Sequence, residues 1–406
     1  MTRFRHLSQA RAYALVTAVI GLALFASATP SPLYGTYREL WGFSPAVLTL
    51  IYATYAFGVL AALLLAGRVS DEVGRRPVLI VALGTLLATS VLFMVADSVA
   101  WLFVARGLQG LATGLALGAA SAAMLDLHAR RDPAGVGLAN GVVSASGMGL
   151  GVLVAAAVVE WLPAPRVLPY VVLFVLFAVA LAGALAMPEP VADRTRPRLT
   201  PQRPGVPPSV RRPFLLAALA VLSSWSIGGL FLSLGPQLTA TLFDSTDHLV
   251  AGLGAFVLSA TGAVAQLALG NRMAPWRGAA YGSVALAAGV LVIVASASTD
   301  SGALLLAGAV IGGAGFGLAF LGALRQLSGV IPPQHRAEVM SAFYVVAYAS
   351  LSLPSVAAGF LVTSMGLEST FELFGSIAAA IALVVALEAW RTRPAEARRS
   401  REAVPA

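Results

Sequence analysis

Apolar runs of about twenty residues alternate with short polar segments along almost the whole chain. A helix of about twenty apolar residues is long enough to cross the hydrocarbon core of a bilayer. Lipid leaves unpaired backbone groups unsatisfied, so runs of this length predict helices rather than loops or open strands. The pattern therefore predicts an all-α membrane protein with twelve transmembrane helices. The predicted spans are 12–29, 45–66, 78–96, 99–125, 135–158, 167–187, 214–235, 249–269, 279–297, 302–324, 339–362 and 370–390.

The arginines in the polar segments predict the orientation in the membrane. Cytoplasmic loops of membrane proteins retain positive charge. When both termini are placed in the cytoplasm, Arg38 and Arg166 lie outside, Arg106 lies within a span, and every other arginine lies in a cytoplasmic segment. The arginines ahead of the first run also fit a secretory signal peptide. Because that run is long enough to span and more spans follow, we interpret it as an uncleaved first helix.

A segment rich in proline and arginine divides the spans into two sets of six. Such a composition cannot bury a core, so we interpret 188–213 as a cytoplasmic linker. Shifting the chain by about 202 residues overlays Gly67 and Arg68 on Gly270 and Asn271, which indicates an internal duplication. The sequence thus predicts two pseudo-symmetric halves. Their boundaries are 1–187 for the N-terminal six-helix half, 188–213 for the linker, 214–390 for the C-terminal six-helix half and 391–406 for a cytoplasmic tail.

Composition excludes several classes of function. Hydrophobic residues make up 58% of the chain and charged residues 11%, with a mean hydropathy of +0.86, whereas soluble proteins carry about 25% charged residues. The absence of cysteine excludes thiolate metal sites, and the four histidines do not cluster, so we expect no metal. No phosphate-binding G-x-x-x-x-G-K-[ST] loop or catalytic triad is present. We therefore expect no cofactor, no enzyme activity and no nucleic-acid partner, since topology explains the basic linker.

A dense polar segment separates the second and third spans and reads G-x-x-x-D-x-x-G-R-R-P from Gly67 to Pro77. Charges packed this closely cannot lie in hydrocarbon, so we expect a tight loop at one membrane face. Gly67 and Gly74 should let the backbone turn. Arg75 and Arg76 should hold the loop on the cytoplasmic side, and Pro77 can begin the next helix.

This loop resembles the signature loop between helices 2 and 3 of the major facilitator superfamily of secondary transporters. The resemblance implies two six-helix halves around a central cavity, alternating access by a rocking motion, and a loop that joins the halves in the outward-open state. Asp71 could then cap a helix of the other half, and the arginines could pair with Asp126 at the end of the fourth span. The alternative is that the loop only fixes topology. The gating candidates are Gly67, Asp71, Gly74, Arg75, Arg76 and Asp126.

The fourth span carries a cation well inside the membrane. Arg106 lies about seven residues from the outer end of the span, or about 10 Å deep. Arg106, Gln109 and Thr113 recur at helical spacing and share one face, which should line the cavity. The R-x-x-Q-G pattern here resembles the span-4 motif of proton-coupled members of the superfamily, which implies a role in coupling. The alternative is a buried arginine that binds backbone carbonyls and serves packing alone.

The fifth span is rich in glycine, which favours close approach of another helix. Gly141, Gly147, Gly149 and Gly151 should let this span pack on a neighbour from the other half. The run resembles the glycine-rich antiporter motif of drug exporters, except that Val152 stands where that motif has proline. Ordinary close packing explains the glycines equally well.

Polar and aromatic residues on otherwise apolar spans are candidates for the wall of a substrate cavity. An aromatic, sparsely charged cavity suits apolar or weakly polar organic molecules better than sugars or polyanions. Each of these side chains could instead serve helix packing. The candidates are Phe25, Tyr52, Tyr55, Trp225, Gln266, Phe316, Tyr344 and Tyr348.

Acidic residues are almost absent from the spans, and the first span has none. If protons are coupled, Asp71, Asp126 and the rim residue Glu160 are the acids to consider. The sequence favours a secondary active transporter of the bacterial cytoplasmic membrane that couples protons to efflux of a small hydrophobic organic compound, such as a drug or secondary metabolite. An importer or facilitator of a small nutrient and a non-transporting receptor are the alternatives. We expect a small-molecule substrate, protons and the lipid bilayer as partners, and a monomer.

Overall fold

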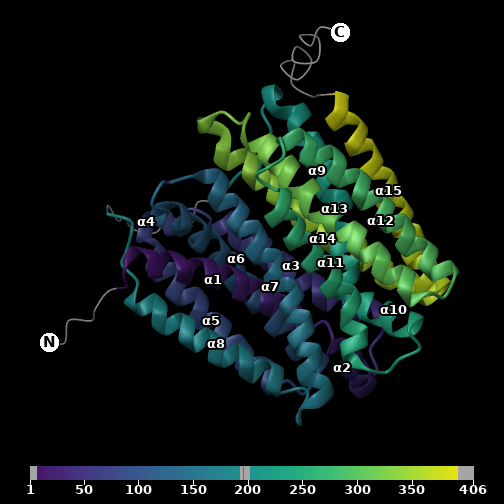
Figure 1. Ribbon diagram of the computed structural model, residues 1–406. Coiled ribbons are helices and arrows are strands. Elements are labelled where there is room, and N and C mark those ends of the chain that lie inside the picture. Colours follow the sequence, from purple (N-terminus) through teal and green to yellow (C-terminus); the bar gives the residue numbers. More distant parts are fainter. Residues whose placement is uncertain (1–6, 193–194, 196–201, 392–406) are drawn as a thin grey trace, which may run out of the picture.

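A computed structural model describes residues 7–192, 195 and 202–391 (Figure 1). Helices and connecting turns make up these ranges, and no strand occurs within them. The α-helices are α1 (Gln9–Ala28), α2 (Tyr34–Trp41), α3 (Pro45–Ala66), α4 (Val69–Val73), α5 (Arg75–Met94), α6 (Val99–Leu127), α7 (Pro133–Trp161), α8 (Leu168–Ala186), α9 (Arg211–Ser233), α10 (Gly235–Leu242), α11 (His248–Leu269), α12 (Pro275–Ser298), α13 (Gly302–Ser328), α14 (Arg336–Met365) and α15 (Leu367–Arg391). Two short 3-10 helices, η1 (Pro208–Val210) and η2 (Pro333–His335), precede α9 and α14.

Twelve of these helices are long and apolar enough to cross a membrane, which confirms the predicted number of spans. They are α1, α3, α5 to α8, α9 with η1, and α11 to α15. Many of the predicted span ends differ from the observed helix ends by a few residues, and α5, for example, begins at Arg75 rather than at Pro77. Proline is tolerated in the first turn because the backbone N–H groups there have no partner within the helix.

Corresponding helices in the two parts of the chain follow the same order, as an internal duplication requires. The eight-residue helices α2 and α10 each follow the first long helix of their part, and Figure 1 shows them close together. The long helices correspond as well. The helix α3 begins at Pro45 and its counterpart α11 begins at His248, a separation close to the shift of about 202 residues that relates the two parts of the sequence. The short helices were not predicted, because eight residues cannot produce a membrane-length apolar run.

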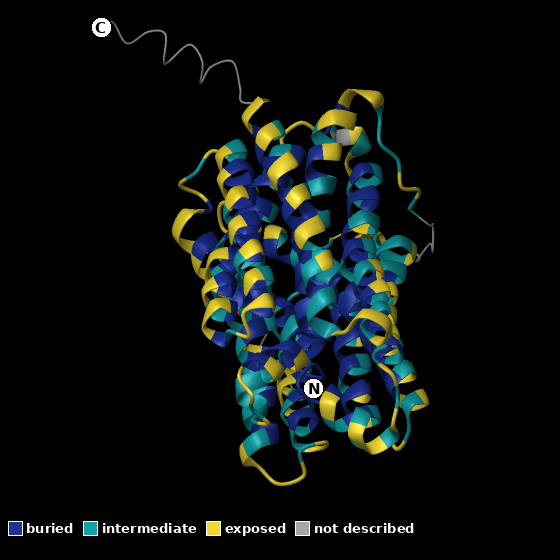
Figure 2. Ribbon diagram, turned by 90° about the vertical axis from the view of Figure 1, so that its right-hand side faces the viewer, coloured by how far each residue is buried: buried dark blue, intermediate teal, exposed yellow. Residues whose placement is uncertain are grey.

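Apolar side chains fill the space between the helices and also cover the outside of the bundle. In the N-terminal part, buried residues such as Leu83, Met124 and Phe177 pack in one core. A second core contains Tyr52 together with Phe231, so it joins both parts. Figure 2 shows buried residues on the inward sides of the helices and exposed ones on the outward sides. Exposed apolar side chains in long outward stripes are expected where a helix faces lipid.

The helix bundle has two ends, which we call the terminal face and the opposite face. The terminal face carries α4, the start of α1 and the end of α15, and the opposite face carries α2 and α10 (Figure 1). The boundaries of the two halves stay a prediction. Of the linker 188–213, the structure describes 188–192, 195 and 202–213, and the tail 391–406 lies outside the described residues beyond Arg391.

Candidate functional site

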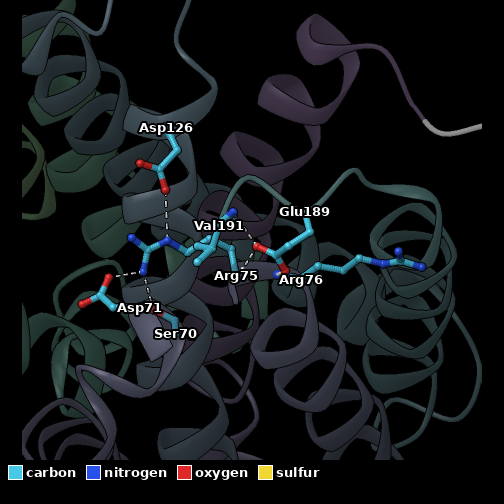
Figure 3. Close-up of polar contacts among 7 residues, drawn as sticks. All are labelled: Ser70, Asp71, Arg75, Arg76, Asp126, Glu189 and Val191. Carbon is cyan, nitrogen blue, oxygen red and sulfur yellow. Dashed lines mark hydrogen bonds and ion pairs between the residues drawn. The ribbon is translucent and has the colours of Figure 1, made fainter. Parts of the chain in front are cut away.

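A polar network on the terminal face is built around Arg75, at the first turn of α5 (Figure 3). Its Nε donates to Asp126 Oδ2 at 3.0 Å, and its Nη1 donates to Ser70 Oγ at 2.9 Å and also to Asp71. The ion pair expected between the loop and Asp126 is therefore present. Asp71 contributes to the same network, and no bond from it to the C-terminal part is found among the described residues. Two carboxylates thus neutralise an arginine side chain that is only 11% exposed.

Glu189 holds the start of α5 from the beginning of the linker. Its carboxylate accepts hydrogen bonds from the backbone N–H groups of Arg75 at 2.9 Å and Arg76 at 3.0 Å (Figure 3). A carboxylate is well suited there, because a helix N-terminus carries unpaired N–H groups and partial positive charge. The Arg76 side chain donates to the Leu185 carbonyl. Sequence reasoning missed Glu189, and the only available signal was an acid next to the end of the sixth span.

The two loop glycines differ in what they do. Gly74 has φ +108°, a conformation that favours glycine, and it immediately precedes α5. Gly67 has φ −59°, which any residue adopts, so the expectation that it eases a turn was wrong. The side chain of Gln202 in the linker lies close to Gly67 instead. A Cβ at Gly67 would lie 3.0 Å from Gln202 Nε2.

Replacing Glu189 with alanine is expected to lower the free energy of unfolding by about 1 kcal/mol, the usual cost of losing a helix N-cap. The variant leaves the first N–H groups of α5 without their carboxylate. Thermal unfolding of the detergent-solubilised protein measures the effect. Glu39→Ala is the matched control, since it removes an equal charge from an exposed position of α2. A Glu189→Ala variant as stable as this control would contradict the capping role.

A second polar site surrounds Arg106, in the interior of α6. The side chain is buried, with 1% of the residue exposed. Its Nη1 donates to the Ser27 carbonyl at 2.9 Å and to Gln109 Oε1 at 2.7 Å. The Gln109 amide donates in turn to the Ala26 carbonyl at 3.0 Å. Arg106 and Gln109 thus hold α6 against the end of α1, whereas the Thr113 hydroxyl, expected on the same face, is buried without a hydrogen-bond partner among the described residues.

Aromatic rings cover the Arg106 guanidinium. Its carbon lies 4.5 Å from the centre of the Tyr55 ring and 5.7 Å from that of Tyr52, distances at which a cation is attracted to a ring. Tyr34 of α2 is buried nearby: burial raises the pKa of its hydroxyl, and the Arg106 charge opposes this shift. The Tyr34 hydroxyl therefore stays protonated, and it has no hydrogen-bond partner within the described part of the chain.

Three of the predicted cavity residues meet where the two parts of the chain contact each other. Tyr55 packs in one apolar cluster with Tyr348 of α14 and with Trp225 of α9. The Trp225 ring lies 5.5 Å from the Tyr348 ring, edge to face. Tyr344, one turn away on α14, is 37% exposed. The Arg106 site and this aromatic cluster share Tyr55, so together they form one candidate substrate site.

The other predicted cavity residues lie elsewhere. Gln266 donates to the Gly317 carbonyl at 3.2 Å, so it joins α11 to α13. Phe316 packs against Gly228 at the α9 contact. Phe25 lies in a recess that is also lined by Val154 of α7 and Val172 of α8, and none of the aromatic cluster lines it.

Hydrogen bonds close the opposite face between the two parts of the chain. Glu160 accepts from the backbone N–H of His248 at 2.9 Å and contacts its Nδ1 at 3.0 Å. Arg38 donates to Gln237 at 2.9 Å, and Ser31 donates to the Leu232 carbonyl at 2.5 Å. All hydrogen bonds found directly between described residues of 7–187 and 214–391 lie on this face.

On the terminal face the linker joins the two parts. Gln202 donates its backbone N–H to the Leu64 carbonyl at 2.8 Å and accepts a hydrogen bond from Ser341 at 2.6 Å. The sequence indicates only that Glu160 is a rim residue, because a contact between distant helices leaves no local pattern.

The glycines of α7 divide between two partners. Cβ atoms at Gly147 and Gly151 would lie 2.2 Å from the carbonyl oxygens of Gly21 and Phe25, so these glycines pack on α1, and the expectation of a partner in the other half was wrong for them. Gly149 faces α11 instead, where a Cβ would lie 3.2 Å from that of Ser259. Gly141 also faces α11. At Gly147 and Gly151 the nearest α1 atoms belong to the backbone, which requires glycine, whereas the nearest α11 atoms at Gly149 and Gly141 belong to side chains.

Comparison with known proteins places this arrangement in a family. A model of the Major Facilitator Superfamily matches residues 16–353. The chain is 36% identical over 100 residues to the multidrug resistance protein MdtL of Escherichia coli O157:H7 and to that of the O45:K1 strain S88, which covers 24% of this chain and 26% of each relative. The match thus spans about a quarter of these relatives. The fold resembles the crystal structure of the human organic anion transporter MFSD10 (TETRAN), with a TM-score of 0.68, 18% identity, and 93% of this chain and 100% of that chain covered. The chain is therefore a multi-pass membrane transporter rather than an enzyme, and it belongs to the major facilitator superfamily.

Proposed function

We propose that this transporter exports small hydrophobic organic compounds across the bacterial cytoplasmic membrane by alternating access, in exchange for protons. The observation that carries this proposal is the aromatic contact of Tyr55, Tyr348 and Trp225 beside Arg106, where the two halves meet. Aromatic side chains with few charges suit an apolar organic ligand. The partial similarity to proteins named for multidrug resistance supports the same class of substrate.

The terminal face is cytoplasmic in this proposal, because it carries the loops in which arginine is concentrated. We propose that the hydrogen bonds across the opposite face close the site toward the outside, and that this arrangement belongs to the state that faces the cytoplasm. In this state Asp71 and Asp126 both bind Arg75 within the N-terminal half. Asp71 is then available to contact the other half when the cytoplasmic side closes, which is the gating role proposed for the loop.

Glu160 is the acid that we propose as the point where external protons act. Its carboxylate accepts both contacts from His248, so it joins α7 to α11 across the halves. Protonation replaces a charged acceptor with a weaker neutral one and should loosen the opposite face. Protonation of Glu160 from the outside would then favour outward opening, and release of the proton to the same side would let the face close, so this residue would gate the face rather than carry the exchanged proton.

Accumulation of fluorescent lipophilic compounds in pump-deficient bacteria tests the proposed export. Cells that express the protein should accumulate less dye than cells without it, and a proton uncoupler should abolish the difference. Asp71→Asn is expected to remove most of the difference while membrane insertion persists, because the amide lacks the charge that binds Arg75. Asp97→Asn is the matched control at an exposed position of the opposite face.

Two results would contradict the proposal. Expression that raises dye accumulation would identify an importer. Export that Asp71→Asn leaves unchanged would show that the loop serves topology alone.

A further inference from the structure

Two charged side chains are buried among the described residues, Arg75 and Arg106, and they differ in how their charge is balanced. Arg75 contacts the carboxylates of Asp71 and Asp126. Arg106 forms no ion pair with any acid in the described ranges. A cation about 10 Å from the end of a transmembrane helix is costly unless an anion or water-filled space compensates it. The described part of the chain therefore leaves the Arg106 charge without a counter-charge.

The hydrogen bonds of Arg106 orient the guanidinium and leave one edge of it unused. Nη1 is held by the Ser27 carbonyl and by Gln109. Nε and Nη2 are buried and have no hydrogen-bond partner among the described residues. These two nitrogens lie on the same edge of the planar guanidinium group. Two N–H donors placed in this way can bind the two oxygens of one carboxylate.

We propose that the Nε and Nη2 edge of Arg106 binds the carboxylate of the transported compound, so that the substrates are amphiphilic organic acids. This inference rests on the proposed export function and narrows its substrate class. The Tyr34 hydroxyl, a buried donor without a partner in the described part, is the second group that would contact the carboxylate. The apolar body of the substrate would pack against Tyr55 and the rings of Tyr348 and Trp225.

A bound carboxylate also explains why the spans can lack a buried acid. The anion supplies the counter-charge for Arg106 when the substrate is bound, through a paired, charge-assisted contact. A small inorganic anion such as chloride could balance the same charge. The two-nitrogen edge and the adjoining aromatic rings favour an organic carboxylate over chloride, because chloride uses neither.

Isothermal titration of the purified protein with three naphthalene compounds tests the inference. The compounds are 2-naphthoate, neutral 2-naphthamide and the cation 2-naphthylmethylammonium, which share a ring and differ in charge. Naphthoate should bind about 10- to 100-fold more tightly than naphthamide, the range that charge-assisted hydrogen bonds contribute to an affinity. Arg106→Gln should remove this preference. Arg166→Gln, which removes an equal charge from an exposed position on the opposite face, should retain it.

Tyr34→Phe provides a second variant in case Arg106→Gln does not fold. The Tyr34 hydroxyl makes no hydrogen bond among the described residues, so its removal should not lower the thermal unfolding temperature. Naphthoate affinity should nevertheless fall by about 3- to 10-fold, since one donor to the carboxylate is lost. A purely structural role for this group predicts no change in affinity.

The possible outcomes separate this inference from the proposed function. Equal binding of naphthamide or the ammonium compound, or a naphthoate preference that survives Arg106→Gln, would overturn the inference. Chloride binding that depends on Arg106, together with no naphthoate binding, would also overturn it. If none of the three compounds binds while cells still export dyes, export stands and the carboxylate assignment fails. If neither binding nor export occurs, both fail.

Discussion

A disulfide between Ala156→Cys and Gly252→Cys is expected to abolish transport. These positions lie on α7 and α11 near the opposite face, and a Cβ at Gly252 would be 3.3 Å from that of Ala156. This separation is close to the usual range for a disulfide, about 3.5–4.5 Å between Cβ atoms. Alternating access requires the two halves to separate on this face, so a covalent link should hold the transporter in one state. Dye uptake into inverted membrane vesicles, the direction that corresponds to export from cells, reports the effect when it is measured after oxidation and again after reduction.

The chain offers clean controls for this experiment, because its sequence contains no cysteine. Each single variant should transport under oxidising conditions. Val294→Cys with Gly375→Cys would join α12 to α15 within the C-terminal half, where a Cβ at Gly375 lies 2.7 Å from Val294 Cγ2. That disulfide should leave transport intact, since it does not cross the halves. Normal export by the fully oxidised Ala156→Cys and Gly252→Cys variant would show that the opposite face need not open.

Features that depend on local chemistry could be predicted from the sequence. Twelve apolar runs predicted twelve helices, because hydrocarbon requires the same local pattern wherever a helix crosses it. The contact of Arg75 with Asp126 could also be predicted, because both residues lie at the ends of spans that reach the same membrane face. Gly74 was interpreted correctly because its role is a property of its own backbone, with φ +108°.

Features that depend on which helices meet could not be predicted. The contact between Glu160 and His248 joins helices that are far apart in the chain, and neither residue belongs to a recognisable motif. Glu189 lies in a linker whose composition indicates only an unstructured connection, although its carboxylate caps α5. On α6, helical spacing placed Arg106 and Gln109 on one face, but not the carbonyl groups of α1 that bind them.

Replacing Gly151 with valine is expected to prevent the protein from folding normally. The new Cβ would lie 2.2 Å from the Phe25 carbonyl oxygen, so the backbones of α7 and α1 would have to separate. Overpacking of this kind costs about 1–3 kcal/mol for side chains that can adjust, and a backbone oxygen adjusts less. The yield of monodisperse protein and its thermal unfolding measure the effect. Gly137→Val, at a position on the same helix where a Cβ meets nothing within 4 Å, is the matched control.

A smaller substitution at the same position, Gly151→Ala, separates the two explanations of the glycines in α7. If the run serves proton exchange, Gly151→Ala should fold and transport without coupling to protons. If it serves the contact with α1, Gly151→Ala should instead lower both stability and ligand binding, because displacement of α1 moves the carbonyl groups of Ala26 and Ser27 that hold Gln109 and Arg106. The structure favours the second result, since the closest approach at Gly151 is to the backbone of Phe25, directly before those two residues. A stable Gly151→Ala protein that binds ligand normally but is uncoupled would support the first.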